Sequence, residues 1–212
     1  MRLTLALGAQ DLRANAVLLG FFVVAGIIAP ALAVSAHVVV TLAAEWIFIT
    51  FGITTIPVMA GFWCVGAEKM SGSMRVLAGL AVSRSAVVCA KHLEAVWLCG
   101  GFIVAGAAVF LMLHVDGPAT STMLLALALP AAIAAGAVAT TLSFVCPPQT
   151  ALVIVMVGSL CAAWPVGNLL VTHYARDPLA TALAAWFASG VLTLAGIVLS
   201  SVIWGSRDDV CR

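Results

Sequence analysis

Residues 68–91 read EKMSGSMRVLAGLAVSRSAVVCAK, and this stretch decides how the rest of the chain is arranged. It holds four of the nine Lys and Arg residues and no long apolar run, in a chain that is 64% hydrophobic. Positive residues of membrane proteins gather in loops on the cytoplasmic side. The stretch therefore predicts a cytosolic loop that separates the apolar sequence before it from the apolar sequence after it.

The composition outside this stretch is that of a protein immersed in lipid. Only 8% of the 212 residues are charged, whereas soluble domains have about 25%, and the mean hydropathy is +1.22. We therefore expect an all-α integral membrane protein with the lipid bilayer as its surroundings. The net charge of +1 and the lack of a basic run predict no nucleic-acid partner.

Six windows are apolar enough for a helix to cross the hydrocarbon, which takes about 20 residues. Backbone groups in lipid must hydrogen-bond within their own segment, so each window predicts a helix. The first window is longer than the ~7–15-residue core of a signal peptide, so we expect it to be retained. Residues 1–212 then form a single transmembrane domain. The six windows are 16–36, 46–66, 94–113, 123–145, 150–171 and 179–204.

The positive residues also predict an orientation. If residues 1–15 are a cytosolic N-terminal segment, eight of the nine Lys and Arg residues lie on the cytosolic side and only Arg176 lies outside. This distribution is typical of six spans with both termini in the cytosol. The expected location is the plasma membrane, crossed several times, with residues 67–92 as the main cytosolic loop.

Part of this loop has the pattern of an amphipathic helix. With residues spaced 100° apart, Met70, Met74, Leu77 and Ala81 fall within an arc of about 60°. A Met-rich stripe suits an adaptable contact with another protein. It would equally suit packing against the inner ends of the chain's own helices, and the pattern alone leaves both open.

The loop resembles that of a known family at several positions. An acidic-basic pair at Glu68 and Lys69 is followed by Gly72-Ser73, two leucines, Val82-Ser83-Arg84 and Lys91. This order is similar to the loop between the second and third spans of ABC-2 type permeases, the membrane subunits of ATP-binding-cassette exporters. Ala81 departs from the pattern, because the family usually has Pro there. The resemblance covers about 24 residues in motif and the whole chain in layout.

The resemblance implies a type V exporter-like fold in which a short cytosolic coupling helix, residues 70–80, docks onto a P-loop ATPase subunit. ATP and Mg would bind that partner, and two permease chains would pair as a homodimer or as a heterodimer with a related permease. The turn at residues 146–149 would be a smaller second contact, although its tandem Pro also fits a plain turn. The implied coupling residues are Glu68, Met70, Met74, Arg75, Leu77, Leu80 and Arg84.

Motifs for chemistry are missing from the sequence. No Gly-x-x-x-x-Gly-Lys-Ser/Thr phosphate loop and no His-Glu-x-x-His zinc motif occurs. The six cysteines form no CxxC pair and are expected to fill apolar helices. We therefore expect no enzyme, cofactor or metal site in this chain, with His92 solvated at the cytosolic end of a span and Glu94 about one turn inside it.

Polar residues within the spans give one hypothesis for a substrate path. Pro165 removes a helix hydrogen bond, so a break near Asn168 would free carbonyls that need water or a polar partner. We expect the path to be lined by Thr54, Thr55, Trp164 and Asn168.

The sparsely charged spans favour export of an apolar or amphipathic cargo such as a peptide, a lipid or a hydrophobic drug. The haem-handling permease-like subunit of cytochrome c maturation is an alternative, because it resembles the chain in length, span number and loop. A non-transporting membrane scaffold or intramembrane enzyme is an alternative of another class.

Overall fold

The computed structural model describes residues 20, 24–28, 32, 55–72, 83–112 and 122–206, and these ranges contain helices but no strand. The prediction of an all-helical chain is confirmed for this part. The predicted segment 1–15 and most of the predicted span 16–36 lie outside it. The helices are η1 (Val24–Ile28), α5 (Ile56–Gly61), η3 (Phe62–Gly66), α6 (Ala67–Ser71), α8 (Arg84–Met112), η4 (Leu124–Ala128), α10 (Leu129–Val145), α11 (Pro148–Arg176) and α12 (Pro178–Ser206).

Three helical stretches of the described residues are long and apolar enough to cross a membrane. They are Arg84–Met112, Leu124–Val145 and Pro178–Trp204, where the third, fourth and sixth spans are predicted. The fifth predicted span coincides with the 29-residue helix α11, whose shorter apolar stretch is Pro148–Ser159. The count of six spans stays a prediction.

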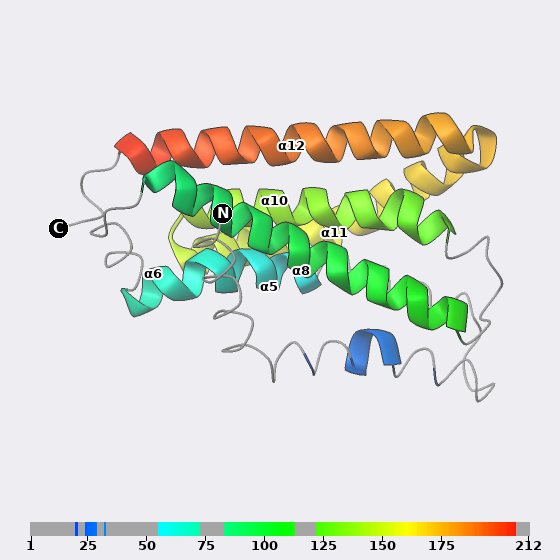
Figure 1. Ribbon diagram of the computed structural model, residues 1–212, viewed down its shortest axis with the longest axis horizontal. Coiled ribbons are helices and arrows are strands. Elements are labelled where there is room, and N and C mark those ends of the chain that lie inside the picture. Colours follow the sequence, from blue (N-terminus) through cyan, green and yellow to red (C-terminus); the bar gives the residue numbers. More distant parts are fainter. Residues whose placement is uncertain are drawn as a thin grey trace.

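The four long helices run alternately in opposite directions (Figure 1). The end of α6, the start of α8 and the end of α12 lie at one end of the bundle, together with the turn after α10. We call this the charged end, because Glu68, Lys69, Arg84, Lys91 and Glu94 lie there. The end of α8 and the turn between α11 and α12 form the opposite, far end. This alternation is what consecutive membrane crossings require.

Helix α10 lies at the centre of the bundle and packs against α5, α8, α11 and α12. Its small residues allow close approach, which suits helix association in lipid. A Cβ placed on Gly61 of α5 would lie 2.7 Å from the backbone carbonyl of Ala139. A Cβ on Gly136 of α10 would lie 2.6 Å from Cys99 Sγ of α8. The helices thus meet where a glycine leaves space for the neighbouring helix.

Helices extend into the predicted loop 67–92 from both sides. Helix α6 continues to Ser71, and α8 begins at Arg84 rather than near residue 94. The early start has a local cause: the Ser83 hydroxyl accepts a hydrogen bond from the backbone N–H of Ala86 at 3.3 Å. A serine in this position satisfies a donor that a helix N-terminus leaves unpaired.

The coupling helix predicted from Met70 onwards is also interrupted. Gly72 has φ 80° and takes the left-handed conformation at the C-terminus of α6. A residue in that conformation ends a helix, and glycine adopts it without a Cβ penalty. Met70 therefore belongs to α6, and the rest of the predicted coupling helix, residues 73–80, lies outside the described residues.

Helix α11 runs through Pro165 without a break. The sequence hypothesis of a broken helix near Asn168 is therefore not realised in the backbone.

Candidate functional site

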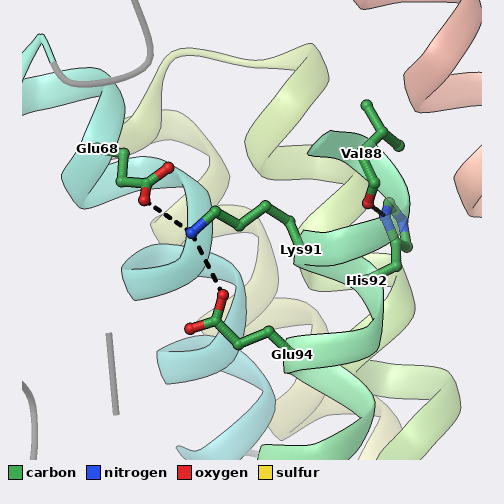
Figure 2. Close-up of polar contacts among 5 residues, drawn as sticks. All are labelled: Glu68, Val88, Lys91, His92 and Glu94. Atoms are coloured by element: carbon green, nitrogen blue, oxygen red, sulfur yellow. Dashed lines mark hydrogen bonds and ion pairs between the residues drawn. The ribbon is translucent and has the colours of Figure 1, made fainter. Parts of the chain in front are cut away.

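Lys91 lies at the centre of a buried ion cluster at the charged end. Its Nζ atom is 2.7 Å from Glu68 Oε1 and 3.3 Å from Glu94 Oε2. The Lys91 side chain is only 2% exposed. Figure 2 shows Glu68 reaching this ammonium group from the neighbouring helix, α6, while Lys91 and Glu94 both come from α8. We call these three residues the ion triad.

The buried charge of Lys91 depends on the two carboxylates of the triad. A charge removed from water costs several kcal/mol, and a close partner of opposite sign is needed to offset that cost. Glu94 lies three residues after Lys91 on the same helix, a spacing that places side chains side by side. Glu68 supplies the contact between helices, so the triad joins the end of α6 to the early turns of α8.

Lys69 makes a second connection from α6. Its ammonium group donates to the carbonyl oxygen of Ser143, to that of Phe144 at 2.8 Å and to that of Cys146 at 3.3 Å. An ammonium group has three donors, and here each finds a carbonyl at the C-terminus of α10. Such carbonyls lack helical partners and carry the negative end of the helix dipole. Lys69 therefore caps α10.

Arg84 binds a carbonyl group near the C-terminus of α12. Its Nη1 donates to the carbonyl oxygen of Trp204 at 3.1 Å, near the C-terminus of that helix. The first residue of α8 is thus bound to the last turns of α12. Of the predicted coupling residues, Glu68 and Arg84 bind within the bundle, whereas Met70 is 61% exposed.

His92 is buried, which contradicts the expectation of a solvated residue. Its Nδ1 is 3.0 Å from the carbonyl oxygen of Val88, and its Nε2 is 3.3 Å from Thr141 Oγ1. A carbonyl can only accept, so Nδ1 carries the proton. The Thr141 hydroxyl donates its single hydrogen to the carbonyl oxygen of Ala137 at 2.8 Å, so it has no second hydrogen to give to Nε2. The ring stacks on Phe144 with 6.0 Å between centroids. His92 points away from the triad (Figure 2) and joins α8 to α10.

The remaining predicted site residues are not brought together by the described structure. Met74, Arg75, Leu77, Leu80 and Thr54 lie outside the described residues, as does the side chain of Trp164. Thr55 is partly buried directly before α5, and Asn168 is exposed on α11.

An apolar groove of about 400 Å³ lies between α10, α11 and α12. Its walls include Ala131, Ala135, Val138, Gly158, Ala162 and Leu192. Neither Thr55 nor Asn168 is among the lining residues, so the groove does not coincide with the predicted substrate path. Among the residues described, no group of three or more His, Cys, Asp or Glu side chains could hold a metal ion.

The sequence reasoning named Glu68 and Arg84 as coupling residues, a role that stays a prediction, and it did not anticipate the contacts of Lys69, Lys91 and Glu94. One signal was available: Lys91 and Glu94 are charged residues three apart inside a helix that is otherwise apolar. Charges in such a place are costly unless paired, so a partner on another helix could have been expected. Comparisons with protein families, with curated proteins and with solved structures find no match to this chain.

Proposed function

We propose that the chain is the membrane permease subunit of an ATP-binding-cassette exporter. It would reside in the plasma membrane as a homodimer or as a heterodimer with a related permease. A separate P-loop ATPase subunit would bind ATP and Mg and dock on the segment between Gly72 and Ser83. The cargo class is apolar or amphipathic: a peptide, a lipid or a hydrophobic drug.

The observation that carries this proposal is the anchoring of both ends of that segment. Glu68 and Lys69 hold the helix before it to α8 and α10, and Arg84 holds the helix after it to α12. A loop anchored on several helices can pass motion from a cytosolic partner to all of them. Three apolar helices are long enough to span a membrane, which supports a place in the bilayer. The positive residues at the charged end favour the cytosolic side for that end.

Purification of the tagged chain from its native membranes tests the proposal. A P-loop ATPase should co-purify, and ATP hydrolysis should accompany the complex. Replacing both Met74 and Leu77 by Asp should release the ATPase while leaving the chain in the membrane, because charge is costly at an apolar contact. Ser71→Ala serves as the control and should leave the complex intact.

Two results would contradict the proposal. A chain that purifies without any nucleotide-hydrolysing partner under conditions that preserve membrane complexes would favour a scaffold. Bound haem in the purified complex would favour the haem-handling alternative. If the Asp pair leaves the ATPase bound, the Met and Leu side chains are not its docking surface.

A further inference from the structure

The ion triad spans the base of the segment 73–82. Glu68 lies four residues before Gly72, where α6 has ended, and Lys91 lies eight residues after Ser83, where α8 is about to begin. The 2.7 Å contact between them joins the helix before the segment to the helix after it, and we call this contact the neck. Because the Lys91 side chain is 2% exposed and that of Glu68 is 17% exposed, the contact is screened far less by salt than a surface ion pair.

The neck is an electrostatic contact between two helices that also share a buried apolar cluster, with Cys64 and Val65 on one side and Val87 and Val88 on the other. Glu94 lies on the same helix as Lys91 and contacts its ammonium group. This contact keeps the Lys91 side chain in place on α8, where it can meet Glu68 of α6. Without the Lys91 charge, the carboxylates of Glu68 and Glu94 would face each other across the joint. Like charges at close range repel strongly where water is excluded, which would weaken the joint between the two helix ends.

We propose that Lys91 is a positioning residue that makes the two ends of the segment 73–82 move as one body. Motion imposed on the segment then reaches α8 and the helix 56–71 together, and it passes to α10 through Lys69 and to α12 through Arg84. The inference rests on the proposed function, in which a docked ATPase supplies that motion. The joint itself is a property of this chain and can be measured without the partner.

The test places one spin label on each side of the neck, at Met70→Cys and Ser85→Cys in a cysteine-free chain. Both positions are exposed and neither belongs to the triad. Distances between the labels are measured in lipid nanodiscs, for the chain alone and for its complex with the ATPase, without nucleotide and after trapping with ATP and vanadate. With Lys91 present we expect one narrow distance that is the same in every state.

In the chain alone, Lys91→Met should add a second population of longer distances between the labels. In the complex, this second population should shift on trapping, while ATP hydrolysis continues. Lys91→Arg keeps the charge and should restore the single distance, which a merely space-filling role would not require. Glu68→Gln removes only the contact between helices and provides a milder variant if Lys91→Met fails to fold.

Distances that remain single and narrow in both Lys91→Met and Glu68→Gln would overturn the inference. So would a distance that changes on trapping while Lys91 is intact, because the two ends would then move separately. These outcomes are distinct from failure of the proposed function, which would appear as the absence of an ATPase partner. In that case the comparison in the chain alone still decides whether the triad forms the joint.

Discussion

At the scale of single residues, Gly61 is a position where two helices meet without room for a side chain. Its missing Cβ would lie 2.7 Å from the carbonyl carbon and oxygen of Ala139 and 2.8 Å from the Ala139 side chain. The carbonyl belongs to a helical backbone and cannot rotate away. The contact between α5 and α10 therefore depends on glycine, although a helix interior ordinarily favours alanine.

Gly61→Ala should lower stability by about 1–3 kcal/mol, the usual cost of overpacking a filled contact. Gly190→Ala is the matched control, because a Cβ there meets nothing within 4 Å and removing a helical glycine stabilises by roughly 0.5–1 kcal/mol. Unfolding of the two variants and the parent in detergent micelles gives the comparison. Equal stability of the two variants would mean that α5 and α10 are not in this close contact.

Single charged residues also show which contacts could be predicted from the sequence and which could not. Glu68 and Arg84 were singled out by their place in the loop, yet the structure shows them binding within the bundle. Lys91 was assigned to a loop, whereas it is buried in α8. The partner of a buried charge depends on which helices are neighbours, and a single sequence does not contain that information.

At the scale of elements, helix ends are decided by local capping. Ser83 caps the start of α8 and Gly72 caps the end of α6, and both residue types are common caps that can be read in the sequence. The predicted loop 67–92 includes residues of α6 and α8, because it follows the charges of Arg84 and Lys91 rather than these caps. The π-helical turns η3 and η4 follow no signal recognised in the sequence.

Lys69→Met should loosen the C-terminus of α10. The ammonium group binds the carbonyl oxygens of Ser143, Phe144 and Cys146, and a hydrogen bond to a charged group contributes about 1.5–3 kcal/mol. Each ~1.4 kcal/mol lost corresponds to a tenfold change in an equilibrium constant. Amide hydrogen exchange in the last turn of α10 should therefore accelerate by about tenfold or more.

The Cys146 amide is the most direct reporter of this change, because it donates to the carbonyl oxygen of Leu142 at 2.8 Å. Arg176→Gln, which removes an exposed positive charge at the far end, is the control and should leave exchange in α10 unaltered. If exchange in α10 is the same with and without the Lys69 ammonium group, the group does not cap this helix.

At the scale of the whole molecule, burial is unevenly distributed among the apolar helices. In the helical stretch Leu124–Val145, which joins η4 to α10, 56% of the most apolar 18-residue window is buried. In the stretch Pro178–Trp204 of α12, only 11% of the corresponding window is buried. An apolar surface as large as that of α12 needs cover by lipid or by another protein. The composition predicted this membrane-like character, while the central place of α10 could not be read from the sequence because all the predicted spans are similarly apolar.

The opposite ends of the bundle lead to a prediction for the molecule in its membrane. Gln149 is the second residue of α11, at the charged end, and Asp177 follows α11 at the far end. Both side chains are exposed. Positive residues favour the cytosolic side, so the charged end should face the cytosol. In a cysteine-free chain in intact cells, Asp177→Cys should react with a membrane-impermeant thiol reagent, and Gln149→Cys should react only after permeabilisation. Reaction of both before permeabilisation would show that α11 does not cross the membrane, and the reverse pattern would place the ion triad and the segment 73–82 outside, where no ATPase could dock.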